Sequence, residues 1–209
     1  METKEILSAY SNYVTEHNSR PQTMAAFAKH IELDESDIYK HFANFASIEA
    51  QILRHFVDNA IELTHKNSAE DEKHNSRESL LTFYFTFTEI LKANRSLVLF
   101  ILPGNRAALS RLNVLKSVKT SFSHFVQHLD LNTPALSFIP ENSIKDKALE
   151  AGVWMQFCSI LLYWLKDDSA DFEKTDIFIE KSLKLTFDLA ESNVMESVFD
   201  LGKFMFGKS

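Results

Sequence analysis

The chain has 209 residues, a hydrophobic content of 45% and a formal net charge of −7 at pH 7. This charge argues against broad affinity for nucleic acids or anionic membranes, and no apolar segment approaches the roughly 20 residues needed to span a bilayer. The one cysteine, Cys158, excludes an internal disulfide, and the N-terminus lacks the pattern of a secretory leader, so we expect a cytoplasmic protein.

Apolar periodicity and capping residues predict helices along the whole chain. Only 4 Gly and 4 Pro occur, which favours long helices with short connections and therefore an all-α fold. A polar run over 66–74 separates two helices, and Asn75 with Glu78 has the pattern of a capping box at the start of the second. The expected helices are 4–18, 23–31, 35–43, 46–66, 76–93, 95–102, 105–129, 142–166, 171–190 and 192–207.

Segment 23–42 is the most informative part of the chain, because it predicts two short helices joined by a tight turn. The Thr23 hydroxyl is placed to cap the first helix, and Asp34 is placed to cap the second. The apolar residues expected to hold the pair together are Met24, Phe27, Ala28, Ile31, Leu33, Ile38, Tyr39 and Phe42. Helix pairs of this kind are used to read DNA.

Residues 4 to about 60 resemble the N-terminal domain of the TetR family of bacterial repressors. The resemblance is carried by Thr23-Met24, Phe27-Ala28 and Tyr39-Lys40-His41-Phe42. It implies a helix-turn-helix domain over 1–46 and a helical ligand-binding and dimerisation domain over 47–209, assembled as a homodimer. By the family's matching positions, the phosphates of a double-stranded DNA operator would be contacted by Thr23, Tyr39 and His41. The residues facing the major groove would be Ser36, Asp37 and Lys40.

The chain departs from the family pattern at positions that matter for DNA. The turn position that usually carries glycine is Glu32, the usual lysine at the start of the fourth helix is Phe45, and Asp37 brings a carboxylate near the phosphates. Residues 1–55 hold five basic and eight acidic side chains, a net charge of −3. Because non-specific DNA affinity comes mostly from phosphate neutralisation, we expect weak DNA binding with few phosphate contacts.

Residues 80–102 are apolar on most sides of their expected helices. Such a segment is either a packed core or the lining of an internal cavity. In TetR-like proteins this region and the eighth helix line the effector pocket. The resemblance therefore implies a site for an apolar small molecule or lipid, formed by Phe83, Phe87, Phe100, Trp154 and Phe157.

Segment 163–179 is similar to a second family, the coenzyme Q biosynthesis accessory proteins. The shared spacing is that of Asp167, Ser169, Phe172, Thr175 and Phe178. That family has a TetR-like fold, binds isoprenoid lipid and shows no DNA role. The other interpretation is that Ser169 caps the next helix while Phe172, Phe178 and Ile179 pack against a second subunit.

We expect dimerisation through helices 142–166 and 171–190, because their apolar residues exceed what one subunit's core requires. These residues include Ile160, Leu161, Tyr163, Trp164, Phe178 and Leu183. The amphipathic segment 192–207 is expected to dock on the body or on a partner subunit, or to contact a membrane surface peripherally through its Phe and Met face.

The sequence has no Gly-rich phosphate loop, no serine nucleophile elbow and no arguable pair of catalytic carboxylates, so we expect neither an enzyme nor a cofactor. His124 and His128 stand at i and i+4 without an evident third ligand, so no metal site is expected. The leading hypothesis is a TetR-like, DNA-binding transcriptional regulator that responds to an apolar small molecule. The alternative is a lipid-binding accessory protein that keeps the fold and does not bind DNA.

Overall fold

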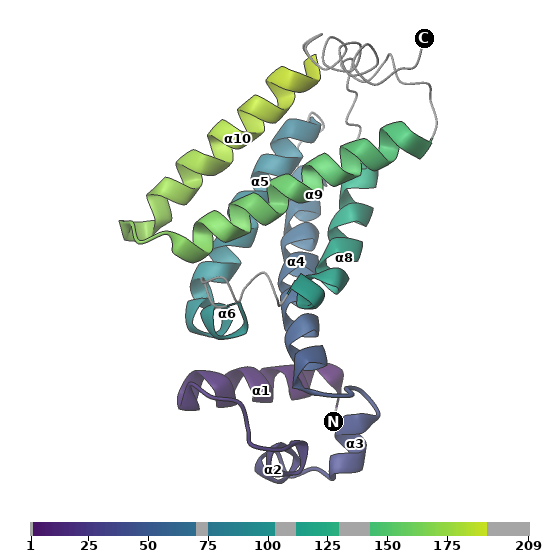
Figure 1. Ribbon diagram of the computed structural model, residues 1–209, viewed down its shortest axis with the longest axis vertical. Helices are drawn as coiled ribbons and strands as arrows, with labels where there is room; N and C mark the ends of the chain where they lie inside the picture. Colours follow the sequence, from purple (N-terminus) through teal and green to yellow (C-terminus); the bar gives the residue numbers. More distant parts are fainter. Residues whose placement is uncertain (1, 70–74, 103–111, 130–142, 192–209) are drawn as a thin grey trace, which may run out of the picture. The chain divides into compact units, whose positions relative to one another are not determined.

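The computed structural model describes residues 2–69, 75–102, 112–129 and 143–191, and every regular element in these ranges is helical (Figure 1). The prediction of an all-α fold is confirmed. The elements are α1 (Thr3–His17), α2 (Met24–His30), α3 (Glu35–Tyr39), α4 (Phe45–Ala69), α5 (Ser76–Ala93), α6 (Arg95–Ile101), η1 (Leu112–Leu115), α8 (Lys116–Gln127), α9 (Ser143–Lys166), η3 (Ala170–Phe172) and α10 (Glu173–Glu191). The predicted helix 192–207 and the start of predicted helix 105–129 lie outside the described residues.

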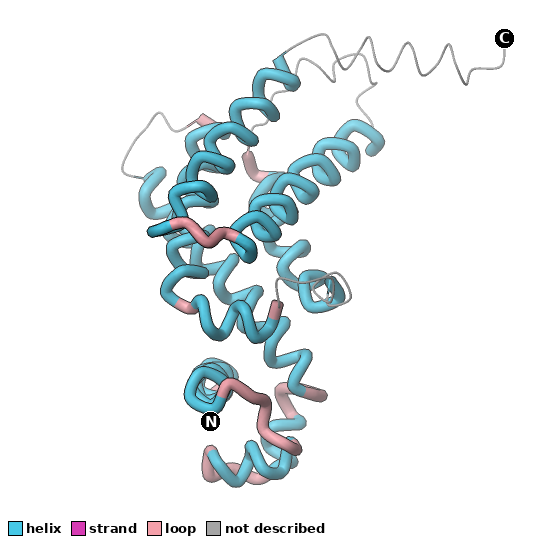
Figure 2. Tube along the Cα trace, turned by 60° about the vertical axis from the view of Figure 1, so that its left-hand side comes forward, coloured by secondary structure: helices cyan, strands magenta, loops and turns pink. Residues whose placement is uncertain are grey.

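The chain divides into two compact units. Unit 1 comprises residues 1–63 and 86–122, and unit 2 comprises residues 64–85 and 123–209. Short loops join consecutive helices within each unit, such as the loop from α1 to α2 and the loop from α9 to α10 (Figure 2). The predicted division at residue 46 is based on the motif and stays a prediction.

An aromatic core holds the N-terminal helices of unit 1 together. The Tyr10 ring stacks on Phe45 with 5.6 Å between centroids and meets Phe27 edge to face at 5.7 Å. Ile38 of α3 is fully buried, α2 packs against α3, and α1 packs against α6. Offset and edge-to-face aromatic pairs add to the gain from apolar burial, so this core places α2 and α3 firmly on α1 and the start of α4.

Phe45 has a structural role at the position where the family usually has lysine. Its ring contacts both Tyr10 and Phe27, the latter with 6.1 Å between centroids. A lysine ammonium group would not take this place among aromatic rings without losing its hydration. Phe45 is therefore part of the aromatic core of unit 1.

Local interactions set the helix ends, and the capping box predicted for α5 is present. Glu78 N donates to Asn75 Oδ1 at 2.9 Å, and Asn75 N donates to Glu78 Oε2 at 3.2 Å. The predicted helix 35–43 is too long, because α3 ends at Tyr39. The N–H groups of His41 and Phe42 both donate to Ile38 O at 2.9 Å, which closes the helix in a tight final turn.

The predicted helix 171–190 begins two residues late in the structure. Asp171 and Phe172 adopt positive φ angles of 54° and 62°, a conformation that an α-helix does not accommodate. α10 therefore starts at Glu173. Ser169, which precedes this turn, has an extended backbone and does not belong to a helix.

α9 and α10 lie side by side in unit 2 (Figure 1). The expectation that their apolar residues exceed the needs of one subunit is wrong for four positions, which are buried within the single chain: Ile160, Leu161, Trp164 and Leu183. The core formed where α9 and α10 pack on the rest of unit 2 already uses these side chains. Among the side chains of this helix pair that the structure describes, the large apolar ones that remain exposed are Met155, Tyr163, Ile177 and Leu185.

Candidate functional site

The helix-turn-helix predicted for 23–42 is formed by α2 and α3. The Thr23 hydroxyl accepts a hydrogen bond from Ala26 N at 3.0 Å, so the predicted N-cap of α2 is confirmed. Asp34 occupies the N-cap position of α3 with an extended backbone, but its side chain makes no capping hydrogen bond. The first turn of α3 is closed through the backbone instead, by Asp37 N donating to Asp34 O at 2.9 Å.

The turn between α2 and α3 requires a left-handed residue, and that residue is Glu32. Its φ is 56°, and the chain closes the turn with a hydrogen bond from Leu33 N to Ala28 O of 2.9 Å. Glycine adopts this backbone conformation without steric cost, whereas in a residue with a Cβ atom the Cβ comes too close to the backbone. The turn of the motif therefore forms with backbone strain at the position where the family pattern places glycine.

The charged groups predicted to face the major groove are paired with each other. Lys40 Nζ lies 2.6 Å from Asp37 Oδ1, and both side chains are exposed. The hydrogen bond from Lys40, together with its charge, lowers the pKa of Asp37, and Asp37 raises the pKa of Lys40 in the same way. A cation thus accompanies the carboxylate that would repel DNA, and this cation would have to leave Asp37 to neutralise a phosphate.

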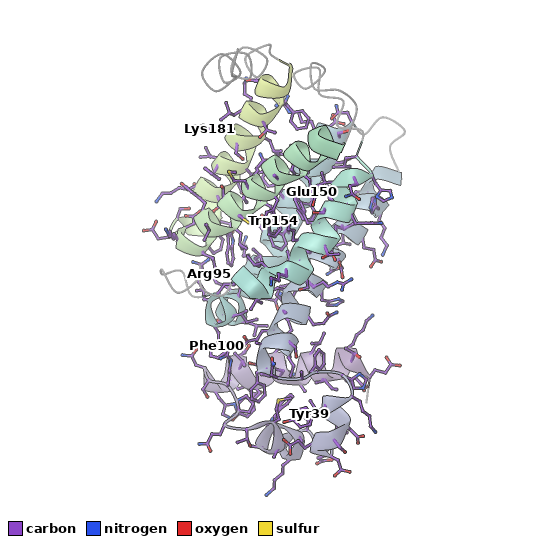
Figure 3. The ribbon with its side chains drawn as sticks, turned by 45° about the vertical axis from the view of Figure 1, so that its right-hand side comes forward. Tyr39, Arg95, Phe100, Glu150, Trp154 and Lys181 are labelled. Carbon is purple, nitrogen blue, oxygen red and sulfur yellow. The ribbon has the colours of Figure 1, made fainter. Side chains whose placement is uncertain are left out.

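The other predicted contact residues also have local partners. The Tyr39 hydroxyl donates to Glu35 Oε1 at 3.0 Å, a hydrogen bond that raises the pKa of Tyr39. His41 Nδ1 lies 3.0 Å from Thr3 Oγ1 of α1. Tyr39, which is labelled in Figure 3, is 50% exposed. Ser36 is exposed as well. The structure thus brings all six predicted DNA-contacting residues together on the α2–α3 segment, and several of them must exchange a local hydrogen bond to contact a phosphate.

A buried carboxylate that sequence reasoning missed links three segments of unit 1. Glu49 of α4 is fully buried and accepts from the Tyr10 hydroxyl at 2.7 Å. Arg20, in the connection between α1 and α2, donates Nε to Glu49 Oε1 at 2.7 Å and Nη2 to Glu49 Oε2 at 2.6 Å. The Arg20 guanidinium also lies over the Phe100 ring of α6, 5.8 Å from its centroid.

Glu49 is one of the eight acidic residues in the N-terminal region, but its negative charge is paired with Arg20 inside the protein. The paired hydrogen bonds from Arg20 compensate the burial of Glu49, and the hydrogen bond to Glu49 raises the pKa of Arg20 further. Burial, followed by the hydrogen bond to Glu49, raises the pKa of Tyr10. In the sequence, the only sign of the Glu49–Arg20 pair is the presence of one acidic residue, Glu49, next to the apolar positions of α4.

The five aromatic residues predicted to line a ligand site fall in both units. In unit 2 the Phe83 ring lies 6.4 Å from that of Phe157, and Trp154 stacks on Phe157 at 5.1 Å. In unit 1, Phe87 is buried and Phe100 lies beneath Arg20. Three of the predicted residues therefore meet in one aromatic cluster, and their role as a binding site stays a prediction.

Asp167 organises the turn between α9 and α10. This buried carboxylate accepts from Ser169 N at 2.9 Å and Oγ at 2.6 Å, and from Thr175 N at 2.8 Å and Oγ1 at 2.6 Å. Burial raises its pKa, but the four hydrogen bonds outweigh burial and bring the pKa to about 2. Ser169 Oγ in turn accepts from Lys174 N at 3.2 Å, so it caps the start of α10.

The aromatic residues of segment 163–179 pack within the same chain. Trp164 lies against Phe172 with 5.5 Å between ring centroids, and Tyr163 stacks on Phe178 at 4.5 Å. Ile179 is fully buried in the subunit, so it does not belong to a dimer face as one interpretation of the sequence proposed. The spacing shared with the lipid-binding accessory family thus has a sufficient local explanation as a helix-joining turn.

A sequence model described as "Tetracyclin repressor-like, C-terminal domain" matches residues 79–205, which is more than half of the chain. The chain belongs to the TetR family. Members of the TetR family are transcriptional regulators rather than enzymes, which confirms the expectation of a non-enzymatic protein. No curated protein sequence matches the chain.

Two solved structures of regulators are similar to this chain, and the first of them supports the fold. The fatty acid degradation regulator FadR from Bacillus halodurans is similar, with a TM-score of 0.54 and 16% identity, over 87% of this chain and 97% of that one. PfmR, a TetR family transcriptional regulator from Thermus thermophilus, has a TM-score of 0.43 and 14% identity, over 86% of this chain and 97% of that one.

None of the helices in the described ranges is long and apolar enough to cross a membrane. No group of three His, Cys, Asp or Glu side chains among the same residues is arranged to hold a metal ion.

Proposed function

We propose that this TetR-family protein is a homodimeric transcriptional regulator that binds double-stranded operator DNA through α2 and α3 and responds to an apolar small molecule. The observation that carries the proposal is the helix-turn-helix itself. Thr23 caps α2, Glu32 takes the left-handed turn conformation, and buried Ile38 anchors α3. This arrangement leaves Ser36 and Tyr39 exposed on the helix pair that reads DNA in such motifs.

In the complex, Thr23, Tyr39 and His41 would contact phosphates, and Ser36, Asp37 and Lys40 would face the major groove. Each phosphate contact by Tyr39 or His41 replaces a hydrogen bond that the free protein already makes, which reduces the gain on binding. Lys40 leaves Asp37 to reach a phosphate or a guanine edge. We therefore expect an operator affinity that is modest and depends only weakly on salt.

The dimer would use the exposed apolar face of α9 and α10. Met155 and Tyr163 lie eight residues apart on α9, and Ile177 and Leu185 lie eight apart on α10, so each pair falls near one side of its helix. Met155 and Leu185 are 67% and 60% exposed, and contact with a partner subunit would remove these large apolar side chains from water. A two-fold axis would bury these four residues against their copies in the partner subunit.

The apolar ligand would bind at the aromatic cluster of Phe83, Trp154 and Phe157. Because the cluster is built from aromatic rings, the recognised molecule would be largely hydrophobic. Such a ligand stabilises the folded state that binds it, so fatty acids or isoprenoids should raise the melting temperature. Trp154→Asp places a charge beside the rings and should abolish this stabilisation.

DNA binding is tested by fluorescence anisotropy with the DNA upstream of the protein's own gene, at several salt concentrations. We expect binding at low salt, with log affinity falling by about 0.9 per phosphate neutralised for each tenfold rise in salt, over few phosphates. Lys40→Ala should weaken binding to all sequences. Lys119→Ala is the control: it removes the same charge from an exposed side chain of α8 and should leave DNA binding unchanged.

The second candidate is a lipid-binding accessory protein without DNA binding, and the acidity of α3 favours it. Glu32, Asp34, Glu35 and Asp37 crowd the turn and α3, while Lys40 is already paired with Asp37. Native mass spectrometry of the purified protein distinguishes the two functions. A co-purified lipid, together with failure to retard upstream DNA even at low salt, would overturn the repressor proposal in favour of this one.

A further inference from the structure

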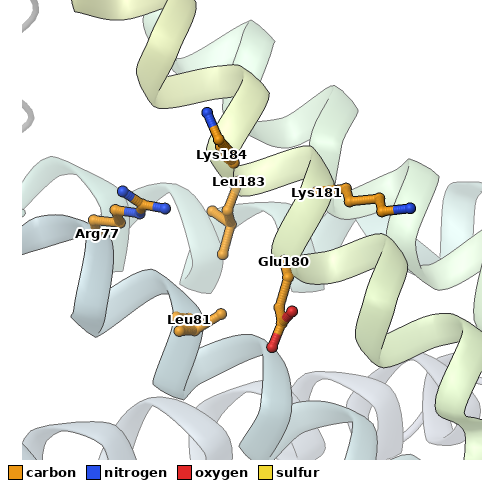
Figure 4. Close-up of a pocket in the computed structure, with 6 residues that line it drawn as sticks. All are labelled: Arg77, Leu81, Glu180, Lys181, Leu183 and Lys184. Atoms are coloured by element: carbon orange, nitrogen blue, oxygen red, sulfur yellow. The ribbon is translucent and has the colours of Figure 1, made fainter.

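A surface pocket in unit 2 belongs to none of the sites described above. It lies between the first turns of α5 and the middle of α10 and has a volume of about 320 Å³ (Figure 4). Its lining residues are Arg77, Leu81, Glu180, Lys181, Leu183 and Lys184. This volume is at the lower end of the range for small-molecule sites, so it suits a small metabolite rather than a macromolecule.

The pocket has opposite charges at its two ends and an apolar surface between them. Leu183 is buried and Leu81 is half-buried, and together they form the apolar part. In Figure 4 the Arg77 guanidinium extends toward α10 near Leu183, whereas the Glu180 carboxylate lies beyond Leu81 on the other side. An occupant must therefore match a positive end, an apolar middle and a negative end.

The two charged ends are available for a ligand. Among the residues that the structure describes, neither Arg77 nor Glu180 makes an ion pair or a side-chain hydrogen bond. Lys184, by contrast, is paired with Asp188 of its own helix. Lys181 extends away from Arg77, so its ammonium group does not serve the positive end (Figure 4).

We propose that this pocket binds a small zwitterion in which a carboxylate and an ammonium group are joined by a short apolar segment. Arg77 holds the carboxylate through its forked N–H groups, a geometry that lysine does not reproduce. Leu81 and Leu183 contact the apolar segment, and Glu180 accepts from the ammonium group. The site is separate from the aromatic cluster and from α2 and α3, so it stands or falls independently of DNA binding and of the apolar ligand.

The test is isothermal titration of the full chain with ω-amino acids of increasing length: 4-aminobutyrate, 6-aminohexanoate and 8-aminooctanoate. Hexanoate and hexylamine each carry one of the two charges and are the matched probes. One member of the series should bind at least tenfold more tightly than either single-charge probe. If hexanoate binds as tightly as 6-aminohexanoate, or if no member of the series binds, the zwitterion assignment is wrong.

Three exposed variants locate the binding. Arg77→Gln should weaken the best ω-amino acid at least tenfold, and Glu180→Gln should reduce its affinity to that of the matching fatty acid. Lys166→Gln removes the same charge as Arg77→Gln from an exposed side chain of α9 that does not line the pocket, and it should keep wild-type affinity. Equal losses in Lys166→Gln and Arg77→Gln would overturn the site, because they would indicate general charge attraction. Circular-dichroism melting of the free variants confirms that each is folded.

Discussion

At the scale of single residues, one buried carboxylate shows how local geometry can outweigh burial. Asp167 has its charge withdrawn from water, which alone would favour the neutral form, yet four donors from Ser169 and Thr175 surround it. Their combined effect lowers its pKa from the ordinary value of 3.8 to about 2. Folding therefore favours the charged carboxylate, and this preference contributes about 2 kcal/mol to stability.

The pH dependence follows from the direction of this shift. Because the pKa is lower in the folded state, the contribution is complete above about pH 4 and is lost as the pH falls toward about 2. Asp167→Asn should destabilise the protein by about 3 kcal/mol at neutral pH. The reason is that the NH₂ group of the new asparagine would face the donor groups of Ser169 and Thr175 and could not accept their hydrogen bonds. The substitution should also flatten the stability profile below pH 4. Urea unfolding at pH 2 to 7 measures both effects.

Asp168→Asn is the matched control for Asp167. The neighbouring Asp168 is highly exposed and pairs only with Lys174 at the surface. Its replacement should leave both the unfolding free energy and the pH profile nearly unchanged. An equal loss of stability in the two variants would show that total charge, rather than the hydrogen bonds of Asp167, stabilises the turn.

Backbone strain at Glu32 gives a second prediction at this scale. Glycine adopts the left-handed conformation without cost, so Glu32→Gly should stabilise unit 1 by about 0.5–1 kcal/mol, after allowing for the greater freedom of glycine in the unfolded chain. Asn18 also has a positive φ, of 48°, but asparagine tolerates this conformation. Asn18→Gly should therefore give a smaller gain, and thermal melting should rank the two variants.

At the scale of elements, α3 combines a structural requirement with a functional one. Its buried Ile38 anchors the helix, while its exposed face carries the Asp37–Lys40 pair. The short spacing between the two side chains makes this pair easy to form, and it competes with any contact between Lys40 and DNA. In the proposed complex with DNA, this pair would therefore limit the affinity of α3.

Asp37→Ser should strengthen non-specific DNA binding, because it removes a repelling carboxylate and releases Lys40. The salt dependence should steepen by about one phosphate contact. Asp58→Ser is a suitable control, since it removes the same charge and releases Arg54 from a similar surface pair on α4. Anisotropy titrations that show no difference between the two variants would place α3 away from the DNA.

At the scale of the whole molecule, the exposed apolar side chains of α9 and α10 are the strongest evidence for assembly. If the protein is a dimer, its melting temperature should rise with protein concentration, because association stabilises the folded state. Met155→Glu should remove this dependence and yield a monomer mass in light scattering. Thr120→Glu, on the exposed side of α8, should preserve the dimer. A wild-type dimer mass in the Met155→Glu variant would contradict the interface.

The helices themselves could be predicted from the sequence because their signals are local. Capping at Thr23 and the box of Asn75 and Glu78 depend on partners three residues away, so the pattern predicts the hydrogen bonds directly. The left-handed turn at Glu32 falls at the position where the TetR pattern usually has glycine. The six candidate DNA contacts come from the same resemblance and stay predictions.

The remaining features were decided by tertiary structure, because they join residues far apart in the chain. Glu49 becomes a buried partner of Arg20 and Tyr10 only when α1 and α4 meet, and no spacing rule connects these positions. Likewise, apolar periodicity does not distinguish Trp164, which is buried in the subunit, from Met155, which is exposed. Both lie on the same apolar helix, and only the packing of α9 against its neighbours determines which one is left for a partner subunit.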